Sequence, residues 1–306
     1  MKPTTILCLI FVLFSFDIMA QKLPTTNVYL FDLKIDSDSS LNLSNATYLT
    51  DFNNKGYNNQ PHFMNEEELY LTVQMEGDTS QTDIYSLNFK TGVKTQVTDT
   101  PESEYSPTLQ YGSSDFLKDN PQFSCVRVAL DEESSQRLWS FPMDRSNGGK
   151  VLFEGMTGIG YHGWVADEVA ALFIVGTPHR LLIANNLNNS KQNIGTTIGR
   201  CLQRGPKGNM YYVRKLDPET WYIRSIDRLT RRTTSVMQTL PDVEDFVVLE
   251  DGSFLMAKGN KLYRWNKKHA NEWKEVADFG FYGLGNITRL AVYKDKYLAI
   301  VNKNDF

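Results

Sequence analysis

Eight residues of this sequence have the chemical types needed to hold a charged ligand or to move a proton. They are three carboxylates, two arginines, a histidine, a tyrosine and an asparagine, namely Asn59, Glu104, Tyr105, His162, Arg200, Glu244, Asp245 and Arg289. Arginine binds carboxylates through paired, charge-assisted hydrogen bonds, so Arg200 and Arg289 could hold an acidic ligand or the chain end of a partner. Two carboxylates at a suitable separation could instead act as acid and base on a glycosidic bond.

His162 is one of four histidines and lies in the segment "YHGW" (161–164). Three roles are open to it: a hydrogen-bonding residue of the structure, a ligand contact, or a residue that assists catalysis. An imidazole between a tyrosine and a tryptophan can satisfy polar neighbours without any ligand. We therefore expect the structural role, and a histidine that bound a ligand as a cation would make binding stronger at low pH.

Other patterns that could indicate a functional site lack the residues or the spacing that such a site requires. The glycines of "GMTGIGYHG" (155–163) lead into a strand, so they do not form a phosphate-binding loop at a helix N-terminus. The run "DSDSS" (36–40) lacks the glycine and distal glutamate of a calcium loop. The cysteines and histidines lack zinc-site spacing, and Ser106 and Ser124 lack the context of a nucleophile elbow. We therefore predict no metal, no cofactor and no catalytic residue.

The first twenty residues have the pattern of a secretory signal peptide. Lys2 precedes the apolar run "ILCLIFVLFSF" (6–16), and Ala20 supplies a small residue for cleavage before Gln21. No later stretch is apolar for long enough to cross a membrane. We expect an exported protein whose single domain spans residues 21–306.

Charge and cysteine content narrow the possible partners and bonds. The net charge of −4 gives no electrostatic reason to expect binding to nucleic acid, which depends on basic patches. The predicted mature chain keeps Cys125 and Cys201, which fall in different copies of the repeat described next. A disulfide is the alternative, but we expect two buried free thiols.

A short strand motif occurs six times along the chain. It has two apolar residues three positions apart, usually followed by Asn or Asp and a polar turn, and its copies are "VYLFD" (28–32), "IYSLN" (84–88), "LWSFP" (138–142), "LLIAN" (181–185), "IRSID" (223–227) and "LYRWN" (262–266). The copies start 39 to 56 residues apart, and the flanking segments alternate apolar and polar residues as strands do. Units of this length with several short strands indicate the blades of a β-propeller.

The two chain ends complement each other. The segments 287–293 and 297–302 predict two inner strands without an outer pair, and 28–33 and 47–52 predict an outer pair without inner strands. Joined, they complete a blade and remove the open edge of the ring. The predicted fold is all-β, a six-bladed propeller of four-stranded blades in which the terminal strands share one blade.

The segment 58–108 has Asn58 and Pro61, then "IY" (84–85), the turn glycine Gly92, and "VT" (97–98). This pattern resembles the TolB-type repeat of six-bladed propellers, although "MNEE" (64–67) stands where that repeat has "SPDG". The resemblance implies an exported binding module, a subunit of a cell-envelope assembly, or a domain that gates a peptidase. The propeller uses the whole predicted mature chain, so it leaves no room for a peptidase domain.

The starts of the innermost strands of a propeller surround its central channel. We expect these starts in "NNQP" (58–61), "EYSP" (104–107), "YHGW" (161–164), "IGRC" (198–201), "VEDF" (243–246) and "ITRL" (287–290), which would bring the eight residues named at the outset to one channel mouth. The leading hypothesis is a non-enzymatic, exported propeller that binds an envelope protein or a small, anionic ligand there, in the periplasm or at the surface of a Gram-negative cell.

Two other hypotheses remain at this stage. One is a hydrolase or lyase that acts on a glycan, lactone or peptide, with channel-mouth carboxylates as acid and base. Carboxylates paired with arginine would count against it, since we expect pairing to keep them ionised. The other is a scaffold whose channel binds only water.

Overall fold

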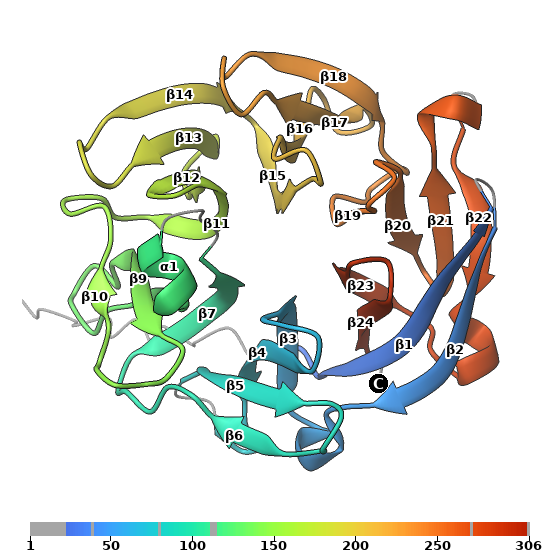
Figure 1. Cartoon of the computed structure of the whole chain (residues 1–306), viewed down its shortest axis with the longest axis horizontal. Coiled ribbons are helices and arrows are strands. Elements are labelled where there is room, and N and C mark those ends of the chain that lie inside the picture. The colour runs from blue at the N-terminus through green and yellow to red at the C-terminus, as the bar shows by residue number, and fades with distance from the viewer. Residues whose placement is uncertain (1–22, 38–39, 79–80, 111–114, 270–271, 305–306) are drawn as a thin grey trace, which may run out of the picture.

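The chain forms a ring of six four-stranded antiparallel sheets, the arrangement of a six-bladed β-propeller (Figure 1). The structure is a computed structural model that describes residues 23–37, 40–78, 81–110, 115–269 and 272–304. The predicted signal peptide, residues 1–20, lies outside the described residues. The predicted all-β fold and its six blades are confirmed.

Blades 1 and 2 follow each other along the chain, and each begins with its innermost strand. Blade 1 contains β3 (Tyr57–Phe63), β4 (Glu68–Gln74), β5 (Asp83–Asn88) and β6 (Lys94–Gln96). Blade 2 contains β7 (Ser103–Leu109), β8 (Gln122–Val128), β9 (Gln136–Pro142) and β10 (Lys150–Val151). The short helix α1 (Asp115–Asp119) interrupts blade 2 between β7 and β8.

Blades 3 to 5 repeat the same strand order. Blade 3 contains β11 (Ile159–Ala166), β12 (Val169–Ile174), β13 (Arg180–Asn185) and β14 (Lys191–Thr196). Blade 4 contains β15 (Ile198–Arg204), β16 (Met210–Lys215), β17 (Trp221–Ile226) and β18 (Thr233–Gln238). Blade 5 contains β19 (Val247–Val248), β20 (Phe254–Lys258), β21 (Lys261–Trp265) and β22 (Lys274–Asp278).

Blade 6 is built from both ends of the described chain, as the sequence predicts. Its order is β23 (Ile287–Tyr293), β24 (Tyr297–Lys303), β1 (Thr26–Ser37) and β2 (Ser40–Tyr48). Strands β24 and β1 pair in continuous register from Thr26 opposite Lys303 to Asp32 opposite Tyr297. This pairing closes the ring. Three short 3-10 helices complete the described elements, namely η1 (Asp51–Asn53), η2 (Lys267–His269) and η3 (Phe279–Tyr282).

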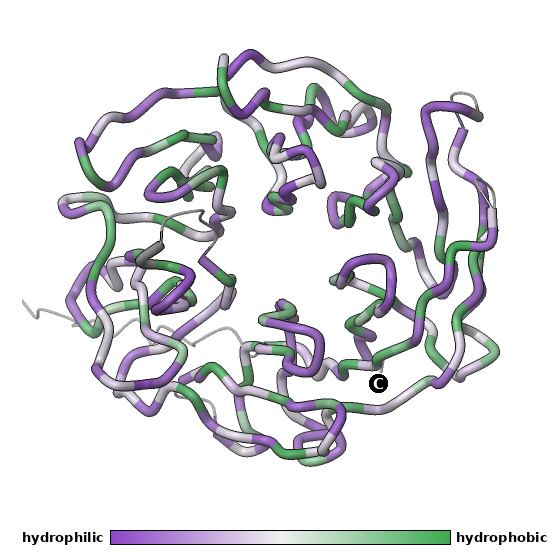
Figure 2. Tube along the Cα trace, in the orientation of Figure 1, coloured by the Kyte–Doolittle hydropathy of each residue, from purple (hydrophilic) through white to green (hydrophobic). Residues whose placement is uncertain are grey.

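The six copies of the repeated strand motif occupy the same place in every blade. Each copy lies on the third strand counted from the channel, which is β1, β5, β9, β13, β17 or β21. Side chains alternate between the two faces of a strand, so this strand contacts both neighbouring blades and needs apolar residues on both faces. Hydrophobic and hydrophilic residues accordingly change over short distances along the chain trace (Figure 2).

The hydrophobic core is divided among the interfaces between blades. Each pair of neighbouring blades has its own cluster of buried side chains. Between blades 5 and 6, for example, Leu255 and Leu262 pack with Phe31 and Ile300. Cys125 is buried between blades 1 and 2 and Cys201 between blades 4 and 5, and both are free thiols. No helix in the described part of the chain is long and apolar enough to span a membrane.

The innermost strands carry irregularities where their first residues approach the channel. The pairing shifts between Asn59 and His62 in β3 and between Tyr105 and Thr108 in β7. Ser106, inside the second shift, has a left-handed φ of 57°, a conformation that non-glycine residues adopt uncommonly. Bulges of this kind re-aim side chains. They decide which residues of the innermost strands line the channel.

Candidate functional site

A cavity of about 850 Å³ opens where the innermost strands begin. We call it the basic vestibule because Arg200 on β15, Arg289 on β23 and Lys303 on β24 all line it. Among the described residues that line the cavity, none is Asp or Glu. A concave surface with charges of one sign concentrates ligands of the opposite sign. The vestibule is therefore suited to an anion.

The remaining wall of the basic vestibule is aromatic and amide-bearing. Tyr57, Tyr105 and Tyr161 come from blades 1, 2 and 3, and Asn59 and Gln136 add side-chain amides. Burial raises the pKa of Tyr57 well above the usual value for tyrosine, so its phenol stays neutral. Tyrosine offers a flat apolar ring with a polar tip, which suits a surface that contacts a partly polar ligand.

A side-chain contact crosses the channel below the basic vestibule. Arg289 Nη2 donates a hydrogen bond to the Tyr161 hydroxyl at 3.3 Å. Arg289 belongs to blade 6 and Tyr161 to blade 3, which lie on opposite sides of the ring (Figure 1). Burial disfavours the charge on Arg289, but the electrostatic interactions with Tyr161 and Asp245 are stronger and raise the pKa of Arg289 above its usual value. The permanently charged guanidinium thus bridges the channel, beside a throat cavity of only about 80 Å³.

Asp245 holds the backbone of the next blade. Its Oδ1 accepts a hydrogen bond from the Leu290 backbone N–H at 2.8 Å, and its Oδ2 lies 3.6 Å from Arg289 Nη1. Burial raises the pKa of Asp245 to about 6, although Arg289 and the Leu290 N–H oppose the rise. Gln60 accepts in the same way from the Ser106 N–H at 2.9 Å. These side chains fasten neighbouring blades around the channel.

Arg200 belongs to a charged triad at the edge of the vestibule. Arg200 Nε lies 2.8 Å from Glu244 Oε1, and Lys215 Nζ lies 2.8 Å from Glu244 Oε2. The Glu244 carboxylate approaches the Gly199 backbone so closely that a Cβ there would lie 2.8 Å from its Oε2. One carboxylate shared by two cations leaves the triad with a net positive charge. The Arg200 side chain is 48% exposed, so it remains accessible.

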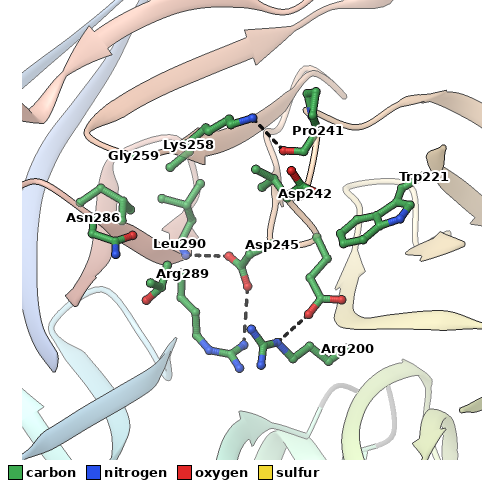
Figure 3. Close-up of a pocket in the computed structure, with 15 residues that line it drawn as sticks. Arg200, Trp221, Pro241, Asp242, Asp245, Lys258, Gly259, Asn286, Arg289 and Leu290 are labelled. Carbon is green, nitrogen blue, oxygen red and sulfur yellow. Dashed lines mark hydrogen bonds and ion pairs between the residues drawn. The ribbon is translucent and has the colours of Figure 1, made fainter. Parts of the chain in front are cut away.

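A second cavity, of about 310 Å³, lies among blades 4, 5 and 6 and adjoins the vestibule (Figure 3). We call it the side pocket. Arg200, Thr288 and Arg289 line both cavities. Figure 3 shows the two guanidinium groups at one end of the pocket, with Trp221 at its side.

A third cavity, of about 450 Å³, lies where the innermost strands end. Arg204 and Lys294 line this far vestibule, together with Glu250, His62 and His162. Burial lowers the pKa of His62 to about 4, so its imidazole is neutral at physiological pH. The channel therefore has two mouths of different character, separated by the throat.

His162 lies inside the channel wall and not at the predicted mouth. It is 6% exposed, and its Nε2 lies 2.7 Å from Ser124 Oγ, which also accepts a hydrogen bond from Trp164 Nε1 at 2.9 Å. Burial lowers the pKa of His162 to about 3, with a further contribution from His62. The Ser–His contact resembles a nucleophile and its base, but Ser124 is fully buried. A ligand in either vestibule cannot reach that hydroxyl, and these contacts fit the expected structural role.

Glu104 also lies away from the opening. Its side chain is fully buried, accepts a hydrogen bond from Thr100, and pairs with Arg127 Nε at 3.0 Å. Arg127 in turn lies 4.1 Å from the centre of the Trp139 ring. Burial raises the pKa of Glu104 to about 7, although Thr100 and Arg127 oppose the rise. The neighbouring Tyr105 points to the opposite face of β7, because side chains alternate along a strand.

The structure separates the eight predicted site residues into groups. Four of them line the basic vestibule, namely Asn59, Tyr105, Arg200 and Arg289. Glu244 and Asp245 lie in the side pocket behind the arginines. The vestibule residues that were not predicted as site residues include Tyr57, Gln136, Tyr161 and Lys303. Tyr57 directly precedes the predicted segment 58–61 and Tyr161 begins the predicted segment 161–164, so the positions at and beside each strand start were the available signal.

Each carboxylate predicted for the channel mouth has a basic partner, as described for Glu104, Glu244 and Asp245. We expected such pairing to keep the acids ionised. Pairing does not hold the pKa of Glu104 or of Asp245 down: the values rise to about 7 and about 6, because the cost of burying a charge exceeds the gain from pairing. Glu104 is therefore partly protonated at neutral pH, and Asp245 remains mostly ionised. Within the described ranges, no group of three or more His, Cys, Asp or Glu side chains could hold a metal ion.

No protein-family model and no curated protein matches the chain. Solved structures do resemble it. A putative TolB from Agrobacterium tumefaciens aligns over 93% of this chain and 100% of its own, with a TM-score of 0.63 and 9% identity. TolB from Acinetobacter baumannii aligns over 90% and 63%, with a TM-score of 0.53 and 9% identity. An oligogalacturonate lyase in complex with manganese aligns over 87% and 83%, with a TM-score of 0.51 and 15% identity. At these identities the likeness concerns the fold.

Proposed function

We propose that this protein is an exported, non-enzymatic propeller that binds a carboxylate-bearing ligand or partner segment in its basic vestibule. One observation carries the proposal: Arg200, Arg289 and Lys303 line a cavity of about 850 Å³ that has no Asp or Glu among its described lining residues. The similarity to TolB propellers supports a protein partner, and the predicted signal peptide supports an envelope location.

The arrangement of the acidic residues supports binding over catalysis. Glu104 is sealed inside the interface of two blades, and Asp245 is fastened to a backbone N–H. Glu244 is held by two cations. None of these carboxylates lines the vestibule, where the described surface offers donors for an anion and no side-chain carboxyl group.

Calorimetric titration of residues 21–306 with matched probes tests the proposal. The charged probes are an oligogalacturonate and a short peptide with a free C-terminal carboxylate, and the neutral probes are the corresponding neutral oligosaccharide and the peptide amide. We expect at least one charged probe to bind and its neutral counterpart to bind weakly. A hydrogen bond to a charged group contributes about 1.5–3 kcal/mol, so Arg200→Ala should weaken binding about tenfold to a hundredfold.

Arg228→Ala is the matched control, because Arg228 is exposed on the outer turn between β17 and β18. It should leave the affinity unchanged. The proposal fails if neither charged probe binds, or if Arg200→Ala and Arg228→Ala have the same effect. Chromatography of the incubated probes covers the enzymatic alternative, because shortened or unsaturated products would show a hydrolase or lyase.

A further inference from the structure

The side pocket has an apolar wall despite its charged rim. Ala257, Ile287 and Leu290 are buried hydrophobic residues that line it, and Val243 and Trp221 complete this wall. Trp221 is fixed in place, because its Nε1 donates to the Asp217 carbonyl at 3.0 Å and Lys215 Nζ lies 4.0 Å from its ring centre. A rigid apolar slot of this kind favours an apolar group of a ligand.

Five of the six charged residues that line the side pocket are engaged with neighbouring groups, and the sixth, Asp242, is exposed. Glu244 contacts Arg200 and Lys215, and Lys258 Nζ donates to the Pro241 carbonyl at 3.1 Å. Asp245 is held by the Leu290 N–H. These contacts satisfy five of the six charged groups, so the slot favours an apolar ligand group over a charged one. The anionic part of a ligand is drawn instead to the basic vestibule.

The two cavities meet at Arg200, Thr288 and Arg289, which line both. A ligand that carries a carboxylate close to an apolar group can therefore place one group in each cavity at this junction. The last residue of a peptide has this arrangement, because its carboxylate and its side chain share one Cα. A uronic acid has the carboxylate but no apolar side chain beside it.

We propose that the basic vestibule and the side pocket together bind the C-terminal end of a peptide chain. The terminal carboxylate contacts Arg200 and Arg289, and an apolar last side chain enters the side pocket. The preceding peptide groups lie in the vestibule, where Asn59 and Gln136 offer side-chain amides. Capture of a terminal carboxylate by convergent donors is a known mode of peptide recognition. This inference rests on the proposed function and narrows its ligand class.

Fluorescence anisotropy with labelled eight-residue peptides tests the inference on the wild-type domain. The peptides share seven residues and end in Leu with a free carboxylate, in Leu amide, or in Gly with a free carboxylate. We expect the Leu acid to bind about tenfold or more tightly than the Gly acid, as burial of a leucine side chain allows. The Leu amide should also bind at least tenfold more weakly than the Leu acid. Equal affinity of the Leu acid and Leu amide overturns the inference.

A variant that narrows the side pocket separates the pocket from the vestibule. Val243 is partly exposed, so Val243→Phe can fill the slot from its rim. This substitution should weaken binding of the peptide that ends in Leu acid about tenfold and leave the affinity for the peptide that ends in Gly acid unchanged. Val93→Phe, on an exposed outer turn of blade 1, is the matched control and should change neither. Equal weakening of the Leu and Gly acids by Val243→Phe counts against the pocket.

The outcomes distinguish this inference from the broader function. If oligogalacturonate binds and Arg200→Ala weakens it, while no peptide shows a preference for an apolar C-terminal residue, the vestibule function stands and the chain-end inference falls. If no carboxylate probe binds, both fall.

Discussion

Asp245→Asn should make the protein more stable than the wild type at neutral pH and not at acid pH. Burial raises the pKa of Asp245 from its model-compound value of 3.8 to about 6. Because the pKa in the folded state is higher than in the unfolded state, the protonated carboxyl stabilises the fold. This contribution is fully present below about pH 4 and is lost as the pH rises through about 6. The difference in pKa corresponds to at most about 3 kcal/mol.

The asparagine variant keeps the shape and the oxygen that accepts from the Leu290 N–H, but it cannot ionise. Urea unfolding of both proteins at several pH values between 4.5 and 7.5 gives the free energy of unfolding. The difference between them should grow with pH, and the contribution of Glu104, whose pKa is about 7, cancels because both proteins contain it. The charged neighbours Arg200, Glu244 and Arg289 are also common to both.

Asp119→Asn is the control, because Asp119 is exposed at the end of α1. Its difference from the wild type should not vary with pH over this range. A loss of stability in Asp245→Asn that is largest at neutral pH would refute the reasoning. It would mean that the ionised carboxylate gains more from Arg289 than burial costs.

Two further perturbations test the ring and the channel wall. Deletion of residues 287–306 removes β23 and β24 and leaves the inner edge of β1 unpaired, so we expect aggregation or loss of cooperative unfolding in calorimetry. A transition as sharp and as high as that of the intact domain would contradict the closure. Ser124→Ala leaves His162 Nε2 and Trp164 Nε1 without their partner and should cost about 2–4 kcal/mol in urea unfolding without changing vestibule affinity. A loss below about 0.5 kcal/mol would assign those groups other partners.

The repeated strand motif made the fold predictable from sequence. The third strand of each blade packs on both faces, so it must be apolar at recurring positions and leaves a visible pattern. The ring closure was predictable for the same reason, because the two chain ends carry complementary halves of a blade. The helix α1 could not be predicted from the sequence, because its five residues are too few to show helical periodicity.

The site was predictable only in part, because side chains alternate along a strand and only every second one faces the channel. Arg200 and Arg289 line the basic vestibule, as the predicted starts of their strands imply. Glu104 is one residue away from Tyr105, yet it points into a blade interface and is fully buried. A shift of one residue reverses the face of a strand. Which residue of a strand start faces the channel depends on the exact position of the strand in its blade, which a single sequence does not display.

The blade that closes the ring also supplies most of the positive charge of the basic vestibule. Arg289 and Lys303 lie on β23 and β24, the last two strands of the chain, and only Arg200 comes from an earlier blade. Without β23 and β24 in blade 6, the described lining of the cavity would lack two of its three cations and the bridge from Arg289 to Tyr161. The proposed anion binding would therefore depend on the same strand pairing that closes the ring.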